Sequence, residues 1–433
     1  MAANPTPDPG CDRRGSAGTD DVLIIGAGIG GLTLALALAQ RGIPARIYEA
    51  AAALEPIGAG LNLLPHAVAV LAELDLFEAL AKAAVITQES IFFNRFGQLI
   101  YREAAGRHAG YPWPQLSMHR GDTQLVLLDA VRQRLGWERV YFGWRCTGAT
   151  ERAGRMVAEF TADSGANLPP QTGSILIAAD GIHSAIRRQL YPTESEPIYS
   201  GVNMWRGLTR QPPFLTGASM VRAGWLSTGK MVIYPVRNHA DGSQLINWVA
   251  ERETPNYQRW DWTRPGRVDD FIGAFADWQF DWLDVPAMIR NADSILEFPM
   301  VDRDPLPRWS FERITLMGDA AHPMLPRGSN GAVQAILDAR DLAHRLATSS
   351  DWVRALEAYD QHRRAATTAV VLTNRSQPPD AILREIHIRT GDRPFRHIDD
   401  VISAAELAEI ANSYKTISGY GRGGAGSGAA APA

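Results

Sequence analysis

Three glycines and a glutamate near the start of the chain have the spacing of residues that bind phosphate and ribose. Gly26, Gly28 and Gly31 form the pattern G-x-G-x-x-G, and Glu49 follows roughly 20 residues later. In such a pattern the first glycine makes a tight turn, the second lets the backbone approach a pyrophosphate, and the third lets a helix pack closely on a strand. Glu49 can accept hydrogen bonds from a ribose hydroxyl, and its negative charge disfavours a 2′-phosphate. The four residues therefore predict a dinucleotide-binding site.

The segment that carries these residues has the hydrophobic pattern of a strand, a helix and a second strand. Val22 to Ile25 is a short apolar run typical of a buried parallel strand, and a long apolar helix follows as far as about Gln40. Residues 45–48 form the second strand, which ends at Glu49. The first N–H groups of a helix lack intrahelical partners and carry partial positive charge, so this helix can bind phosphates at its N-terminus.

Two alternative interpretations of the motif are weaker. Residues 22–39 carry no charge and are about long enough to span a bilayer, but their glycines stand in the register of the motif, which argues against a membrane helix. The pattern alone is also a weak signal, because Gly421, Gly423 and Gly426 match it in a tail with no strand before it and no helix after it. Only the first match has the expected context.

Two later loops carry residues that could contact the same ligand. Gly60 lies in a turn of small residues before a predicted helix at 65–74, where backbone can pass close to a planar ligand, although an ordinary loop has the same composition. Arg120 precedes an amphipathic helix predicted over 123–135, with Asp122 as its N-cap. This arginine could bind a phosphate or could be a surface residue, and the sequence leaves both readings open.

Two aspartates directly follow buried strands farther along the chain. Asp180 follows a predicted strand at 174–179, and Asp319 follows one at 313–317. A carboxylate at the end of a buried strand can accept hydrogen bonds from ligand hydroxyl groups. The run Gly328-Ser329-Asn330-Gly331 then opens a helix to about residue 346.

The composition is that of an ordinary globular protein. Hydrophobic residues make up 45% and charged residues 21% of the 433-residue chain, a length that predicts two or three structural units. The net charge of −4 gives no general attraction to nucleic acid or to an anionic membrane. Cys11 and Cys146 form neither a disulfide framework nor a metal-binding spacing, so we expect a cytoplasmic protein without a metal site. Residues 1–19 lack the apolar region of a signal peptide, and we expect them and 421–433 to be disordered.

The region from about 196 to 303 differs from the rest of the chain in its hydrophobic pattern and its tryptophan content. Segments such as 231–234 and 244–250 alternate apolar and polar residues, which predicts an antiparallel sheet with half-buried faces. Eight of the twelve tryptophans lie between Trp205 and Trp309. This enrichment fits the wall of a pocket for a flat aromatic molecule, and it fits equally well the bulky core of a sheet.

Three signatures occur in order along the chain: the glycine motif with Glu49, then Ala179-Asp180-Gly181, then Gly318-Asp319-Ala320-Ala321-His322-Pro323. Together they resemble the FAD-dependent aromatic hydroxylases of the p-hydroxybenzoate hydroxylase and salicylate hydroxylase type, over about residues 21–374. Stretches such as SMHRGDTQ, MWRGLT and FPMVDRDPLPRW are similar to the members of this family that modify phenazines, such as 5-methylphenazine-1-carboxylate.

The resemblance implies an α/β fold with a Rossmann-like FAD-binding domain, as in p-hydroxybenzoate hydroxylase. This domain would be interrupted by a mostly antiparallel β-sheet substrate domain and followed by a helical C-terminal segment. We expect the FAD-binding domain at 20–85, 115–195 and 304–375, the substrate domain at 86–114 and 196–303, and the C-terminal segment at 376–420. Helices are expected at 352–374 and 404–415.

The resemblance also implies cofactor contacts. Asp319 matches a contact to the FAD ribityl chain, Arg120 matches an arginine that holds FAD, and Asp180-Gly181 lies near the pyrophosphate and is associated with use of NAD(P)H. The helix after Gly328 would direct its N-terminus at the pyrimidine edge of the flavin and stabilise negative charge on the reduced ring. The expected FAD-binding residues are Gly26, Gly28, Gly31, Glu49, Gly60, Arg120, Asp180, Gly181, Asp319, Gly328, Asn330 and Gly331.

Two features of the sequence qualify these contacts. Many relatives carry G-x-G-x-N where this chain has Gly328-Ser329-Asn330-Gly331, so the geometry of this loop is less well defined than the aspartate contacts. A second fingerprint for a nicotinamide domain is missing, as the resemblance implies, because NAD(P)H docks transiently in this family.

The implied reaction uses FAD, NADH or NADPH as reductant, and O2. Hydride reduces FAD, O2 adds to give a flavin hydroperoxide, and one oxygen atom passes to a small aromatic substrate, phenazine-like or carboxylated. The candidate catalytic residues are Pro323, His322, Tyr234 and Arg206, and the candidate substrate contacts are Leu63, Trp205, Arg206, Tyr234 and Leu325. A well-packed turn explains His322 and Pro323 better than an acid–base role does, and Arg206 could pair with a substrate carboxylate or be an ordinary surface or sheet-edge arginine.

Other functions fit parts of the same pattern. Trp260–Pro265 partly resembles the W-x-W-x-I-P motif of flavin halogenases, but Arg264 replaces the isoleucine and none of the chain's three lysines lies in a halogenase motif. A Baeyer–Villiger oxidation, or hydroxylation with decarboxylation, would use the same flavin chemistry. A non-catalytic FAD-binding protein would show no NAD(P)H consumption stimulated by an aromatic compound. We expect a monomer or a homodimer.

Overall fold

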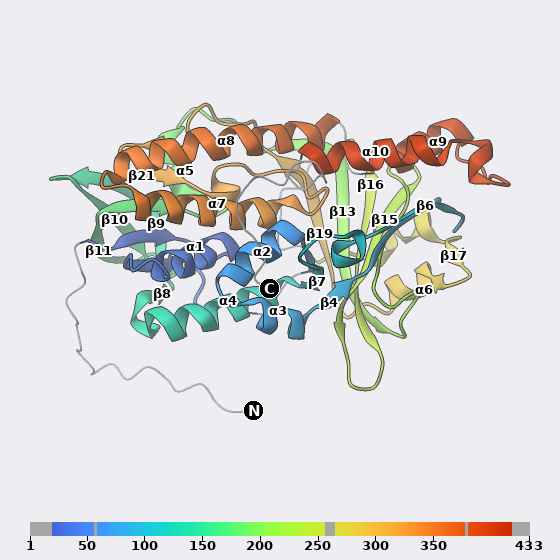
Figure 1. The fold of residues 1–433 in the computed structure, drawn as a ribbon, viewed down its shortest axis with the longest axis horizontal. Coiled ribbons are helices and arrows are strands. Elements are labelled where there is room, and N and C mark those ends of the chain that lie inside the picture. The colour runs from blue at the N-terminus through green and yellow to red at the C-terminus, as the bar shows by residue number, and fades with distance from the viewer. Residues whose placement is uncertain (1–19, 56–58, 256–264, 377–379, 418–433) are drawn as a thin grey trace.

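The computed structural model of the chain describes residues 20–55, 59–255, 265–376 and 380–417 (Figure 1). The termini predicted to be disordered, 1–19 and 421–433, and nearly all of Trp260–Pro265 lie outside these residues. The described chain is a mixed α/β fold built around two large sheets.

The first large sheet has six strands in the order β20-β21-β12-β1-β2-β8. All neighbouring strands are parallel except β20 and β21. Every residue of β1 is buried, because a parallel sheet covered on both faces has no polar face. The strands are β1 (Val22–Ile25), β2 (Ala45–Glu49), β8 (Val140–Phe142), β12 (Ile175–Ala178), β20 (Ser310–Phe311) and β21 (Ile314–Leu316).

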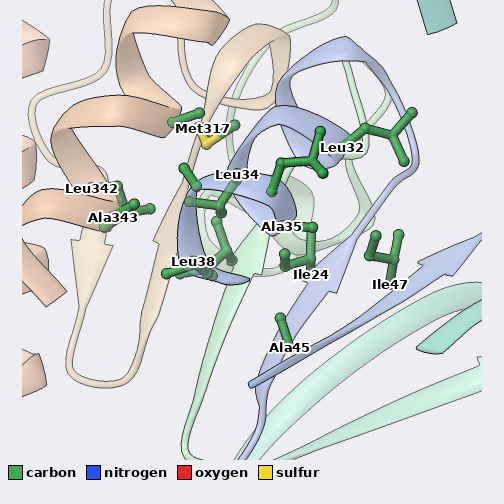
Figure 2. Close-up of a cluster of buried hydrophobic side chains, with 14 of the residues drawn as sticks. Ile24, Leu32, Leu34, Ala35, Leu38, Ala45, Ile47, Met317, Leu342 and Ala343 are labelled. Carbon is green, nitrogen blue, oxygen red and sulfur yellow. The ribbon is translucent and has the colours of Figure 1, made fainter. Parts of the chain in front are cut away.

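Helix α1 (Ile29–Ala39) is the charge-free segment that follows the glycine motif, and it lies in the core. Figure 2 shows Leu34 and Leu38 of α1 between Ile24 of the sheet and Leu342 of α7 (Asn330–Thr348). The helix is apolar all round because the sheet covers one side and α7 and α4 (Arg120–Leu135) cover others. No helix in the described ranges has the length and apolar character needed to cross a membrane.

The other face of the six-stranded sheet meets a small antiparallel sheet of order β11-β10-β9. Tyr48, which follows Ile47 on β2 and so points to the opposite face, packs on Phe160 with ring centroids 4.6 Å apart. The small sheet comprises β9 (Arg145–Arg152), β10 (Arg155–Thr161) and β11 (Asn167–Gly173).

The second large sheet has seven strands in the order β19-β13-β16-β15-β14-β5-β6. Its pairs are antiparallel except β14 and β5. The strands are β5 (Glu89–Phe93), β6 (Leu99–Ala104), β13 (Ile198–Gln211), β14 (Ser219–Trp225), β15 (Gly229–Asn238), β16 (Gln244–Glu253) and β19 (Ile295–Asp302). One face packs on an aromatic core that includes Trp205, Trp248 and Trp278. Four of the eight tryptophans of this region, these three and Trp282, therefore belong to the core of this sheet.

A third, three-stranded sheet lies between the two large ones. Its order is β3-β7-β4, with β3 (Gly60–Leu63), β7 (Gln115–His119) and β4 (Val85–Thr87). The Gly60 N–H donates to Asn247 Oδ1 of β16 at 2.6 Å, which fixes this sheet to the seven-stranded one.

Helices complete the fold on both sides of the sheets. Helix α8 (Trp352–Ser376) packs on α7, and α9 (Ala381–Thr390) packs on β14 and β5 of the seven-stranded sheet (Figure 1). The predicted helix at 352–374 is present as α8, and the one at 404–415 as α10, whereas α9 was missed. These and the remaining helices are α2 (Pro65–Glu73), α3 (Phe77–Ala83), α5 (Ala185–Leu190), α6 (Val285–Arg290), α8 (Trp352–Ser376), α9 (Ala381–Thr390) and α10 (Ala404–Ile417).

Candidate active site

A single continuous cavity of about 800 Å³ joins the two large sheets. At one end it is bounded by loops at the carboxyl ends of β1, β12 and β21, which is where open α/β sheets bind ligands. At the other end it is bounded by one face of the seven-stranded sheet. We call these the cofactor end and the substrate end.

The three motif glycines have different physical reasons to be glycine. A Cβ on Gly26, whose φ is +104°, would lie 2.4 Å from the Ala179 carbonyl oxygen, and one on Gly31 would lie 2.1 Å from the Gly26 carbonyl oxygen. Both positions therefore serve the protein's own packing. A Cβ on Gly28 would meet no described atom within 4 Å and Gly28 lines the cavity, so its bare backbone faces space that is open to a ligand.

Glu49 lies at the end of β2 and lines the cofactor end. Its two carboxylate oxygens accept hydrogen bonds from the backbone N–H of Ala27, at 2.8 Å, and of Ala51, at 2.9 Å. These bonds fix the carboxylate, and each oxygen retains a lone pair for a ligand hydroxyl. The Glu49 carboxylate is thus held at the cavity wall and keeps acceptor capacity for a ligand.

Asp180 and Gly181 line the cofactor end after β12. Asp180 Oδ2 accepts from the Ala185 N–H at 3.0 Å, while Oδ1 is buried and receives no hydrogen bond in the described structure. Burial raises the pKa of the Asp180 carboxyl. A buried acceptor without a donor at the wall of a cavity fits a ligand that brings a hydroxyl or N–H group.

Asp319 lines the same end, on the short turn that follows β21, and two buried groups clamp this turn. From one side, the Arg187 guanidinium donates to the carbonyl oxygens of Ala320, at 3.0 Å, and Ala321, at 3.1 Å. From the other, Asp338 Oδ2 accepts from the Gly318 N–H at 3.1 Å. Asp319 itself is exposed to the cavity, so the clamps act on its backbone and leave its carboxylate available.

His322 belongs to this clamp and does not line the cavity. Its Nε2 lies 2.6 Å from Asp338 Oδ2, and the Arg363 guanidinium donates to Asp338 Oδ1 at 2.7 Å. Burial alone would raise the pKa of Asp338, but His322 and Arg363 outweigh it and lower that pKa to about 2. Pro323 is buried beside His322 and is likewise absent from the lining, so both residues lie in a packed turn, which is the reading of the sequence that an acid–base role had to compete with.

Helix α7 begins at the cavity, where Gly328, Ser329, Asn330 and Gly331 form part of the lining. Ser329, the N-cap, adopts a left-handed conformation with φ of +58°, which glycine adopts more readily. Ser329, where this chain departs from the glycine pattern of many relatives, therefore still adopts a backbone conformation that glycine favours. The Asn330 side chain donates to the Gly328 carbonyl oxygen at 3.1 Å and closes the loop.

Arg120 and Gly60 meet the cofactor end from the third sheet. Arg120 is exposed at the first position of α4, and its backbone N–H donates to the Ala59 carbonyl oxygen at 3.1 Å. A Cβ on Gly60 would lie 2.7 Å from both Asn247 and Tyr234, so only glycine allows this approach to the seven-stranded sheet. Both residues line the cavity, as does every other predicted FAD-binding residue except Gly31.

Strand alternation decides which residues face the substrate end. Met204 and Arg206 of β13 line the cavity, whereas Trp205 between them is buried in the aromatic core and stacks on Phe271 at 4.8 Å. This corrects the prediction that Trp205 contacts substrate. Leu63 and Leu325 are also buried and absent from the lining, Leu63 in the core of the first sheet and Leu325 beside Met300.

Arg206 and Tyr234, both predicted as substrate contacts, are neighbours on the cavity face. An Arg206 terminal nitrogen donates to the Gly60 carbonyl oxygen at 3.2 Å, and its buried Nε meets no acceptor among the described residues. Burial lowers the pKa of Arg206, and Tyr234 beside it raises it. Burial likewise raises the pKa of Tyr234, so its hydroxyl stays protonated at neutral pH.

Four further charged residues line the substrate end and were not predicted: Arg222, Lys230, Glu251 and Asp380. Lys230 Nζ lies 2.9 Å from Glu251 and 2.6 Å from Asp380, and Arg222 Nε lies 3.3 Å from Asp380. Lys230 and Glu251 are opposite one another on β15 and β16, a register that the strand pattern could have indicated. Asp380 precedes α9, and no local signal places it here.

The comparisons with known proteins agree with this architecture. Residues 19–374 match the family model described as an FAD binding domain. The chain is 41% identical over 406 residues to the phenazine 1,6-dicarboxylic acid hydroxylase PhzS of Lysobacter antibioticus, covering 92% of this chain and 97% of that protein. It is 31% identical over 402 residues to the 3-amino-4-hydroxybenzoate 2-monooxygenase PtnB3 of Streptomyces platensis, covering 91% and 95%.

The fold is also found in solved structures. Klebsiella pneumoniae HpxO, crystallised with FAD and uric acid, matches with a TM-score of 0.71 at 24% identity, over 93% of this chain and 96% of that one. Fold and cavity thus define a flavoprotein with a Rossmann-like FAD-binding sheet. The chain belongs to the FAD binding domain family and, within it, to the FAD-dependent aromatic hydroxylases. It is an FAD-dependent aromatic monooxygenase that uses NAD(P)H as reductant.

Proposed function

We propose that the enzyme hydroxylates a planar, carboxylated nitrogen heterocycle of phenazine size, with Arg206 pairing with the substrate carboxylate. Arg206 carries the proposal: it faces the cavity, forms no ion pair with a carboxylate in the described residues, and holds an Nε that meets no acceptor. A guanidinium in this state binds a planar carboxylate well, because its N–H groups form a fork that matches two oxygens. The likeness to the phenazine dicarboxylate hydroxylase supports the ring class.

The residues of the cofactor end would hold FAD in this proposal. The Gly28 backbone and the N-terminus of α1 would meet the pyrophosphate, and Glu49 would accept from the adenosine ribose. Asp180 would lie near the pyrophosphate and Asp319 would accept from the ribityl chain. The N-terminus of α7 would stabilise negative charge at the pyrimidine edge of the flavin.

Bound FAD supplies hydride acceptance from NAD(P)H and activation of O2, and the chain's residues supply position and electrostatics. Arg206 would orient the substrate ring by its carboxylate. Tyr234 would donate its hydroxyl proton to a polar atom of the ring, since its raised pKa keeps that proton in place. Met204, Met220 and Val232 are apolar lining residues that would exclude water from the reacting face.

The wider biology is part of the same proposal. We infer that the enzyme works in the cytoplasm, where NAD(P)H is supplied, as a monomer or homodimer and without nucleic acid or membrane partners. The proposed domain division assigns the six-stranded sheet to FAD and the seven-stranded sheet to substrate, with the ranges predicted from the sequence.

The test is oxidation of NADH and NADPH by the FAD-loaded protein with phenazine-1-carboxylate, phenazine-1,6-dicarboxylate, unsubstituted phenazine and benzoates. We expect carboxylated phenazines to stimulate oxidation and to gain one oxygen atom by mass spectrometry. Gain of oxygen with loss of CO2 would indicate decarboxylating hydroxylation. Stimulation by benzoates alone would refute the proposed ring class. If none of these compounds yields an oxygenated product, the proposed reaction is refuted for this set of compounds.

A further inference from the structure

The strand register of the seven-stranded sheet places the residues of its cavity face in rows. Strands β13, β16, β15 and β14 are neighbours in this order. Arg206 of β13 is opposite Val249 of β16, and Val249 is in turn opposite Val232 of β15. Val232 is opposite Arg222 of β14. Directly opposite residues share a face of a sheet, and all four line the cavity, so they form one row across four strands.

The centre of this row is apolar, whereas its neighbours along the strands are polar. On β15, Lys230 and Tyr234 lie two residues before and two residues after Val232, on the same face of the strand. On β16, Glu251 lies two residues after Val249 and pairs with Lys230 at 2.9 Å. We call Val232 and Val249 the valine pair. It is an apolar patch with charged or hydroxyl-bearing side chains around it.

The valine pair is open to the cavity and does not belong to the aromatic core. Val232 is half-buried and Val249 is 7% exposed, and both line the cavity. Ile233 and Trp248, which are their neighbours in the chain, point to the opposite face and lie in the aromatic core. Apolar surface that faces a cavity with a polar rim fits the apolar body of a ligand whose polar groups reach the rim.

The spacing of the valine pair matches a fused ring system. Val232 and Val249 are opposite one another on neighbouring strands, which lie about 4.8 Å apart in a sheet. The two outer rings of a linear three-ring system are separated by two ring widths, which is close to this spacing. One aromatic ring over Val249 leaves Val232 uncovered, whereas a linear three-ring system can cover both.

We propose that Val249 and Val232 are specificity-determining residues, each supporting one outer ring of a linear three-ring substrate whose long axis crosses β16 and β15. The inference rests on the proposed function, because it takes the substrate carboxylate at Arg206 as its fixed point. The ring that carries the carboxylate then lies over Val249, and the far ring lies over Val232 toward Arg222. One long edge of the ring system faces Tyr234, whose hydroxyl can donate to a ring nitrogen.

The test uses three ligands that carry one carboxylate and differ in the number of fused rings: benzoate, 1-naphthoate and phenazine-1-carboxylate. Because the charge is the same in all three, their comparison does not depend on how many cations line the cavity, Arg120 and Arg327 included. Dissociation constants of the FAD-loaded protein are measured from the change in flavin absorbance on titration at neutral pH. We expect each further ring to tighten binding to the wild type roughly tenfold, because it removes more apolar surface from water.

Substitutions of the two valines should act on different rings. Val232→Phe fills the place of the far ring, so it should weaken binding of phenazine-1-carboxylate by about tenfold or more and leave that of benzoate within about twofold. Val249→Phe fills the place of the ring that all three ligands share, so it should weaken each by about tenfold or more. Where the larger residue at 249 disturbs folding, Val249→Ala removes the shared apolar contact and should weaken each ligand roughly threefold.

The matched control is Val157→Phe. Val157 is half-buried on β10, outside the cavity lining of the described residues, so this variant should leave all three dissociation constants and the flavin content unchanged. The decisive comparison is made in a Val232→Phe variant that is folded and holds FAD. If it weakens benzoate as much as phenazine-1-carboxylate, or weakens neither, the role of the valine pair is overturned.

The outcomes separate this inference from the proposed reaction. Oxygenated product from phenazine-1-carboxylate together with either of those two results overturns the role of the valine pair and leaves the reaction standing. Binding that follows the expected order in the wild type and in both variants, without oxygenated product, supports the valine pair and refutes the reaction. Failure of all three ligands to bind the wild type overturns both.

Discussion

The two ends of the cavity recognise their ligands in different ways. The cofactor end consists largely of backbone: glycines, helix N-termini and carboxylates fixed by peptide N–H groups, as Glu49 is by Ala27 and Ala51. The substrate end consists of long charged side chains, such as Arg206 and Lys230, that project from one face of a sheet. A substitution in a backbone site tends to weaken binding of the ligand without creating a new contact, whereas a side-chain site can acquire a new specificity through single substitutions. This difference suits an enzyme that keeps one cofactor and varies its substrate.

The strongest test of the fixed character of the cofactor end is Asp338→Asn. The substitution leaves Arg363 and His322 without their buried counter-ion, so we expect a loss of about 3–5 kcal/mol in the free energy of unfolding. Urea unfolding of the variant and the wild type measures it. A loss below about 1 kcal/mol would show that the clamp on the Asp319 turn is not rigid.

Asp338 also makes the free energy of unfolding depend on pH. Since the pKa of Asp338 is about 2 when folded against an ordinary 3.8, its stabilisation is fully present above pH 3.8 and is lost as pH falls toward 2. The expected loss is roughly 2 kcal/mol and should be missing from Asp338→Asn. An acid-unfolding curve of the variant parallel to that of the wild type would contradict this assignment.

The second test separates two glycines of one motif. Gly26→Ala places a Cβ against the Ala179 carbonyl at a φ of +104° and should destabilise the fold by about 3 kcal/mol. Gly28→Ala meets open space and should leave the melting temperature of the apoprotein unchanged while sharply reducing FAD retention. Thermal unfolding and flavin content together measure both effects. Equal effects of the two substitutions on stability would show that packing alone selects these glycines.

The third test compares adjacent residues of β13. Arg206→Met should raise KM for a carboxylated substrate by roughly 10- to 100-fold without loss of FAD, because it removes the charged hydrogen bonds to the carboxylate. Trp205→Leu should cost about 2 kcal/mol of stability and leave KM unchanged, since Trp205 packs on Phe271 in the core. Steady-state kinetics measure KM for both variants, and urea unfolding measures their stability. A change in KM with Trp205→Leu and none with Arg206→Met would reverse the assignment of the two faces.

The smallest effect is expected at the loop before α7. Ser329→Gly relieves a left-handed backbone and should stabilise the protein by about 0.5 kcal/mol, with Ser329→Ala as the control that keeps the strain. Differential scanning calorimetry measures the change in melting temperature. Destabilisation by glycine would mean that the serine side chain, not the backbone, holds the loop.

The difference between the two ends also explains why the residues of the cofactor end were easier to predict from the sequence than those of the substrate end. The glycine motif, Asp180 and Asp319 follow buried strands, so local pattern places them at one edge of a parallel sheet without knowledge of the rest. At the substrate end, whether Trp205 or Arg206 faces the cavity depends on which face of β13 is covered by the core. The alternation of side chains along the strand puts the two residues on opposite faces but does not show which face is covered. The place of Asp380 in the cavity could not be predicted, because it depends on how α9 packs against the sheet, and α9 was not recognised in the sequence. Asp380 is the N-cap of that helix, but its side chain makes no capping hydrogen bond, so the usual N-cap signal was missing.

The strand order of the six-stranded sheet has a consequence for the time course of folding. β1 lies between β2, which follows it closely in the chain, and β12, while β12 pairs with β21, which begins only at Ile314. At a synthesis rate of about 5–20 residues per second, β1 and β2 would wait roughly 15 to 60 s for the last of these strands to be made. Because its pairings are this distant, the sheet must form slowly and late. The apolar strands and α1 therefore need shielding from other nascent chains until the second half of the protein exists.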